Sequence, residues 1–158
     1  MKLKGKEKFF WERNFNIKSL ADIPSEINSI TGIDSEHDDD FFFFLTSRVS
    51  SVGEIHLRCT NVTDEGVKYI CTLKNLREFT LKDHRQVTKA CLPDINKLTD
   101  LECLDISKNN ISIEDLCLLT NLKNLKQLFI SSDKPESEMA EELEKLKTHF
   151  SGSEITVY

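Results

Sequence analysis

The chain lacks several features that would place it in other protein classes. Its longest apolar run, residues 41–45, is far shorter than the roughly 18 residues that a membrane-spanning helix needs. No apolar run follows the lysines at its start, so we expect no signal peptide. Basic charge is also limited, because 21 Lys and Arg residues stand against 27 Asp and Glu residues, for a net charge of −6. This balance argues against a surface that binds nucleic acid.

Glycine and cysteine are scarce, and their placement argues against further kinds of site. The 5 glycines are too dispersed to build a phosphate-binding loop. The 5 cysteines are Cys59, Cys71, Cys91, Cys103 and Cys117. Their number is odd and no two form a C-x-x-C pair, so the pattern predicts free thiols and neither a disulfide framework nor a metal site. Free thiols are typical of a reducing compartment, and we expect a cytoplasmic protein without a cofactor.

The remaining polar residues carry little sign of catalysis. The acidic run at residues 34–40 lacks the alternating spacing of a calcium-binding loop, and we interpret it as a loop that leads into a helix. None of the 4 histidines shares a local nucleophile motif with a serine or cysteine. An enzyme would have to use His56, Cys103 and Asp105, and we expect the protein to be non-enzymatic.

What the sequence does contain is an internal repeat. Four segments have the form apolar-x-x-apolar-x-apolar, at residues 52–57, 76–81, 101–106 and 125–130. Their central residues Ile55, Phe79, Leu104 and Leu128 stand 24, 25 and 24 residues apart. Alternation with period 2 predicts strands with one buried face.

The segments between these strands are periodic as well. Each contains apolar residues at steps of three, which are Val67, Ile70, Leu73 and Leu76, then Leu92, Ile95, Leu98 and Leu101, then Leu116, Leu119, Leu122 and Leu125. This spacing predicts an α-helix or 3₁₀ turn with one apolar stripe. One strand and one short helix cannot bury these residues alone, so the repeats must stack, with a parallel sheet on one side and helices on the other.

The residues that carry the repeat resemble a known family. The segment Leu57-Arg-Cys-Thr-Asn-Val-Thr-Asp-Glu-Gly-Val67 is similar to the pattern of the leucine-rich-repeat superfamily, in its ribonuclease-inhibitor-like or cysteine-containing branch. The resemblance implies that Asn109 bonds turn backbone between coils, with Thr60 in that place one repeat earlier. Residues 83–86 carry one extra residue, for which we expect a bulged turn. The implied fold is α/β, a short horseshoe-shaped solenoid with the sheet on its concave side.

The ends of the chain are expected to cap this array. We predict an N-terminal capping segment at residues 1–26, repeats at 27–133 with a divergent first one, and a capping helix with an edge strand at 134–158. Residues Ile27, Ile30 and Ile33 would form the first strand, while Phe9, Phe10, Trp11 and Phe15 would cover the open end of the core. The segment Ile23-Pro-Ser-Glu-Ile27 resembles the opening of an F-box, although the rest of that helical bundle is missing.

The resemblance implies that the protein binds another protein through outward strand residues of the concave face. Alternation places eight residues there, namely His56, Arg58, Thr80, Lys82, Asp105, Ser107, Phe129 and Ser131. Phe129 is the candidate anchor, unless the C-terminal helix covers it. We expect a monomer that binds neither nucleic acid nor membrane. The alternative is the repeat region or short form of a NOD-like receptor, or a ubiquitin-ligase substrate adaptor.

Overall fold

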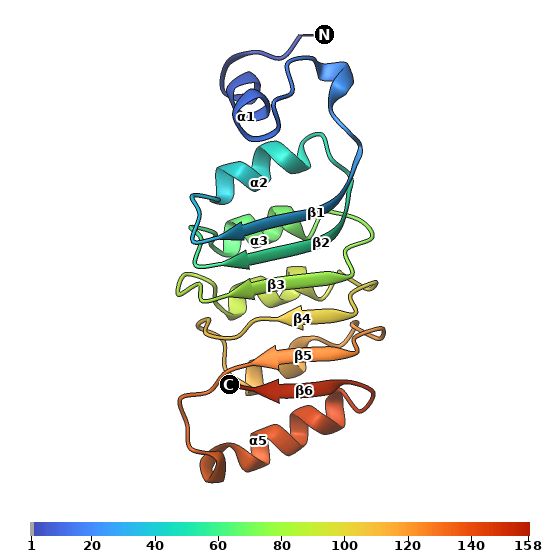
Figure 1. The fold of residues 1–158 in the computed structure, drawn as a ribbon. Helices are drawn as coiled ribbons and strands as arrows, with labels where there is room; N and C mark the ends of the chain where they lie inside the picture. Colours follow the sequence, from blue (N-terminus) through green and yellow to red (C-terminus); the bar gives the residue numbers. More distant parts are fainter. Residues whose placement is uncertain (1) are drawn as a thin grey trace.

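The computed structural model describes residues 2–158. Within these residues, six parallel strands form one sheet and follow each other across it in the order of the sequence. The strands are β1 (Glu26–Ile33), β2 (Ser51–Arg58), β3 (Glu78–Lys82), β4 (Cys103–Asp105), β5 (Gln127–Ile130) and β6 (Glu154–Val157). Figure 1 shows the strands stacked as rungs, with helix α3 behind the sheet and α2 next to β1. The predicted α/β solenoid is confirmed.

Helical segments connect the strands on the other side of the core. The α-helices are α1 (Gly5–Phe15), α2 (Asp39–Thr46), α3 (Asp64–Ile70), α4 (Leu92–Ile95) and α5 (Glu136–His149). The 3₁₀ helices are η1 (Leu20–Asp22), η2 (Lys89–Cys91) and η3 (Glu114–Leu118). Along the array the connection shortens from the 8 residues of α2 to the 5 residues of η3, which is purely 3₁₀. Apolar residues at steps of three suit this tighter helix, because its residues i and i+3 eclipse.

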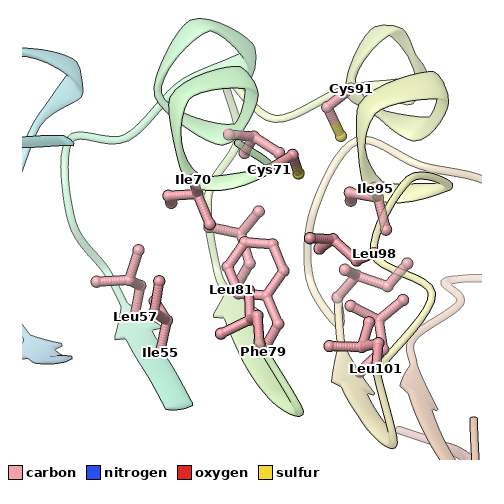
Figure 2. Close-up of a cluster of buried hydrophobic side chains, with 14 of the residues drawn as sticks. Ile55, Leu57, Ile70, Cys71, Phe79, Leu81, Cys91, Ile95, Leu98 and Leu101 are labelled. Carbon is pink, nitrogen blue, oxygen red and sulfur yellow. The ribbon is translucent and has the colours of Figure 1, made fainter. Parts of the chain in front are cut away.

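The core lies between the sheet and these helices. All four central strand residues, Ile55, Phe79, Leu104 and Leu128, are fully buried. The twelve apolar residues at steps of three are also buried. Figure 2 shows side chains of β2 and β3 pointing toward those of α3 and α4. The predicted register of the repeats is therefore confirmed.

The first strand forms as predicted and contains Ile27, Ile30 and Ile33. Ile30 is buried and pairs in register with Ile55. Ile33, the last residue of this strand, is 58% exposed. Because side chains alternate along a strand, the inward position after Ile30 falls on Gly32, the register partner of Leu57.

The N-terminal aromatic residues cover the open end of the core only in part. Phe10 and Trp11 of α1 are buried, and the ring of Phe10 lies 5.2 Å from that of Phe41 in α2. Phe9 is 63% exposed, so the prediction is wrong for this residue. The segment that resembles an F-box does not begin a helical bundle, because Glu26 and Ile27 already belong to β1.

The C-terminal part continues the sheet. After α5, β6 pairs with β5 in the register Leu128 to Ile155, so that it extends the same stack. Leu146 and Phe150 are buried against the last repeat. Among residues 2–158, no helix is long and apolar enough to cross a membrane.

Hydrogen bonds from side chains join successive coils where the strands end. Asn109 donates to the carbonyl oxygen of Leu81 (2.6 Å) and accepts from the backbone N–H of His84 (2.8 Å), which confirms its predicted role. The residue at the equivalent place in the coil before is His84, whose Nε2 accepts from the backbone N–H of Thr60 (3.3 Å). The prediction that Thr60 holds this place one repeat before Asn109 is therefore wrong by one coil, because Thr60 lies in the coil before His84.

Candidate protein-binding face

The outward side chains of the sheet form regular columns. The pairing brings Thr31, His56, Thr80, Asp105, Phe129 and Thr156 side by side, one from each strand. A second column contains Ser29, Glu54, Glu78, Cys103, Gln127 and Glu154. We call these two columns, with Arg58 and Lys82 beside them, the open face. Helix α3 lies behind the sheet, on the side opposite to this face (Figure 1).

One end of the open face carries stacked aromatic rings. The ring of Tyr158, directly after β6, lies 6.2 Å from that of Phe129 at an interplanar angle of 15°. The ammonium nitrogen of Lys82 lies 4.4 Å from the centre of the Tyr158 ring, within the range of a cation–π contact. Phe129 is therefore partly covered, but the covering ring belongs to Tyr158 and not to the C-terminal helix. Tyr158 was missed in the sequence because it lies one residue beyond the last strand.

Two predicted face residues lie beyond the strands, and one is not exposed at all. Strand β4 ends at Asp105, and Lys108 turns the chain with a φ of 59°. Ser107 is consequently fully buried, and its hydroxyl donates to the Asp105 carboxylate (2.6 Å), so its predicted place on the face is wrong. Ser131 is half-buried just after β5, where its hydroxyl oxygen accepts from the backbone N–H of Lys108 (2.6 Å).

The other end of the open face is polar. The imidazole of His56 lies with Nδ1 3.3 Å from the Thr80 hydroxyl oxygen. Its Nε2 lies 3.6 Å from a carboxylate oxygen of Glu54 and 3.9 Å from one of Glu78. The side chains of Glu54, His56 and Glu78 are between 34% and 47% exposed. The face thus combines carboxylates at this end with Lys82 and two aromatic rings at the other.

The residues on which an enzyme would depend are not arranged as a nucleophile and its base. Burial raises the pKa of the Cys103 thiol, and the carboxylates of Glu78 and Asp105 raise it further. The thiol is therefore protonated at neutral pH, whereas a nucleophilic cysteine needs a lowered pKa. The Asp105 carboxylate accepts bonds from the Ser107 backbone (3.0 Å) and hydroxyl, which assigns it a structural role in the turn.

Comparison with known protein families agrees with this geometry. Residues 51–71 and 97–116 match the family model described as Leucine Rich repeat. The first match contains β2 and α3, and the second contains β4 with the start of η3. The two matched segments are leucine-rich repeats, and the fold of the chain is that of a leucine-rich-repeat solenoid. Repeats of this kind are typically non-enzymatic and generally mediate protein–protein interaction. No curated protein matches the chain significantly.

Proposed function

We propose that this leucine-rich-repeat solenoid is a non-enzymatic module that binds another protein through its open face. The observation that carries the proposal is the column from His56 to Phe129, which presents outward side chains in continuous register on the side of the sheet opposite to α3. Because the strands are already paired, little backbone entropy would be lost on association. Such a rigid surface favours binding of a folded partner.

The aromatic end of the open face supports a role as contact anchor. Phe129 and Tyr158 are stacked, and Tyr158 keeps 57% of its surface exposed. Aromatic residues that lie in the centre of an interface contribute much of its binding free energy. Lys82 beside them would add a charge that a partner carboxylate can neutralise, while the polar end would suit a basic group.

The experiment compares two double variants of matched chemistry. Phe129→Ala with Lys82→Glu alters the open face, whereas Leu118→Ala with Lys68→Glu truncates one apolar side chain and reverses one charge in exposed residues of η3 and α3. Both variants change the net charge equally. Proteins captured by the wild-type chain are quantified by mass spectrometry. We expect at least one specific partner to be lost, about tenfold or more, only with the open-face variant.

An unchanged set of partners with the open-face variant would place the binding site elsewhere. We leave Asp105 unaltered in this experiment because its carboxylate holds the turn at Ser107, so that its replacement would confound binding with stability.

We further propose that the protein acts as a cytoplasmic monomer of the ribonuclease-inhibitor-like type. Size-exclusion chromatography tests the monomer.

The same face would serve if these repeats act in a NOD-like receptor or as a ubiquitin-ligase substrate adaptor. In either setting, the identity of the partner lost with the open-face variant distinguishes the roles. A signalling protein would favour the receptor, and a ligase subunit would favour the adaptor.

A further inference from the structure

Three potential metal ligands converge at the polar end of the open face. Glu54 and His56 come from β2, and Glu78 comes from β3. One carboxylate oxygen of each glutamate and one ring nitrogen of the histidine all lie within 4.8 Å of one another. No local motif reveals this set, because the ligands are contributed by two different coils.

The spacing of these atoms is close to that around a bound Zn²⁺ ion. With ligands at about 2.1 Å from zinc, two ligand atoms of a tetrahedral site lie about 3.4 Å apart. The His56 Nε2 already lies 3.6 Å from Glu54 and 3.9 Å from Glu78. Small rotations of exposed side chains would complete the site, while the pairing of Glu54 with Glu78 and of His56 with Thr80 holds the backbone in place.

The second nitrogen of the imidazole is placed as in many metal sites. The Nδ1 of His56 lies 3.3 Å from the Thr80 hydroxyl oxygen, so an Nδ1–H can donate to it. Donation from Nδ1 leaves the lone pair of Nε2 directed toward the two carboxylates. Metal-binding histidines are commonly oriented in this way by a hydrogen bond from the other ring nitrogen.

Two carboxylates at this end lie beside a single imidazole. Glu54 and Glu78 stand directly opposite each other on neighbouring strands, an arrangement that is destabilising for like charges. When the imidazole donates from Nδ1 to Thr80, its Nε2 and the two carboxylates are acceptors that face one another. A cation at this point would satisfy all three groups at once.

We propose that Glu54, His56 and Glu78 bind a divalent transition-metal ion, with Zn²⁺ as the best fit. An imidazole together with two carboxylates suits zinc, whereas calcium and magnesium prefer an all-oxygen set. Three protein ligands leave one tetrahedral position open toward the outside of the sheet. The proposal holds whether or not the open face binds a protein.

The test measures zinc affinity by competition with a chromophoric chelator, using the full chain stripped of metal and kept reduced. We expect one zinc ion per chain. His56→Ala and Glu78→Gln should each weaken binding by about 100-fold, and Thr80→Val by about tenfold, because it removes only the orienting hydroxyl. Glu144→Gln, an exposed glutamate of α5, should leave the affinity unchanged.

Two further measurements separate this site from binding to cysteines. Cys103→Ser should keep the wild-type affinity, because the proposed ligand set contains no thiolate. Co²⁺ should give the visible absorption of a tetrahedral site, and that absorption should disappear in His56→Ala. Zinc binding that is equally strong in wild type, His56→Ala and Glu78→Gln, or that is absent below millimolar zinc, would overturn the proposal. Thermal melts confirm that each variant is folded.

Discussion

The Nε2 of the buried His84 lies 2.8 Å from the hydroxyl oxygen of Thr60 in the preceding coil. The backbone N–H of His84 in turn donates to the Asn109 side chain of the following coil. The three residues therefore form one line of hydrogen bonds across three coils. The imidazole of His84 takes the place that the Asn109 amide has one coil later. Because an imidazole titrates and an amide does not, the stability of the array should depend on pH.

Acid should weaken the fold through this histidine. Burial lowers the pKa of His84 below its ordinary value of about 6.5, although Asp83 opposes the shift. The unfolded chain then takes up a proton before the folded one does. The stabilising contribution is complete above about pH 6.5 and is lost as the pH falls toward the lower pKa of the folded state. We expect the free energy of unfolding to fall by up to about 1.4 kcal/mol per pH unit for this one group.

Urea unfolding between pH 7.5 and 5.5 measures this effect, with His84→Asn as the comparison. Asparagine offers the same kind of hydrogen bonds without titrating, so the variant should show a clearly smaller slope. Burial also lowers the pKa of His37, so part of the pH dependence of stability should remain in His84→Asn. Equal slopes in the two proteins would show that His84 does not titrate differently in the folded and unfolded chains.

Gly66→Ala should destabilise the protein although alanine favours helices. A Cβ at Gly66 would collide with the carboxylate of Asp39. That carboxylate accepts from the backbone N–H (2.9 Å) and the hydroxyl (2.6 Å) of Thr63. Losing these bonds costs about 1–3 kcal/mol, against a gain of about 1 kcal/mol from helix propensity. We expect a lower denaturation midpoint.

The matched control for this substitution is Gly152→Ala, where a Cβ would meet nothing within 4 Å. Its free energy of unfolding should stay within about 0.5 kcal/mol of the wild-type value. A Gly66→Ala variant that is more stable than the wild type would show that the Asp39 carboxylate does not constrain this position.

Leu104→Asp should abolish cooperative unfolding. Leu104 is fully buried in β4, where a carboxylate would have no charged partner. Gln127→Asp introduces the same group on β5 but at an exposed, outward position, and should melt within a few degrees of the wild type. Circular dichroism melts compare the two. A normal melt of Leu104→Asp would contradict the register of the repeats.

The cysteines should differ in reactivity according to their place in the coils. Cys71 and Cys91 are buried between α3 and α4 (Figure 2), and burial raises the pKa of Cys91 to about 12 and that of Cys71 further. Iodoacetamide at pH 8 should therefore label Cys59, Cys103 and Cys117 first, as followed by peptide mass spectrometry. In urea all 5 should react alike. Native labelling of Cys91 at the unfolded rate would contradict its burial.

Much of the repeat could be predicted because its signals are local. The alternation along a strand and the steps of three along a helix depend only on the geometry of neighbouring residues, so Phe79 and Leu104 could be placed in the core from the sequence. The columns that contain Thr80 and Asp105 followed from the same alternation and the constant period. The exceptions lie where a strand stops early, as β4 does before Ser107.

The features that were missed depend on contacts between coils. The bond from His84 to Thr60, the ring of Tyr158 on Phe129 and the convergence of Glu54 and Glu78 on His56 each join different strands or turns. The sequence by itself determined the solenoid and its inward residues, because hydrophobic burial repeats with the chain. Only the tertiary structure decided which polar side chains meet, because hydrogen bonds and charge pairs depend on distances between atoms of different coils.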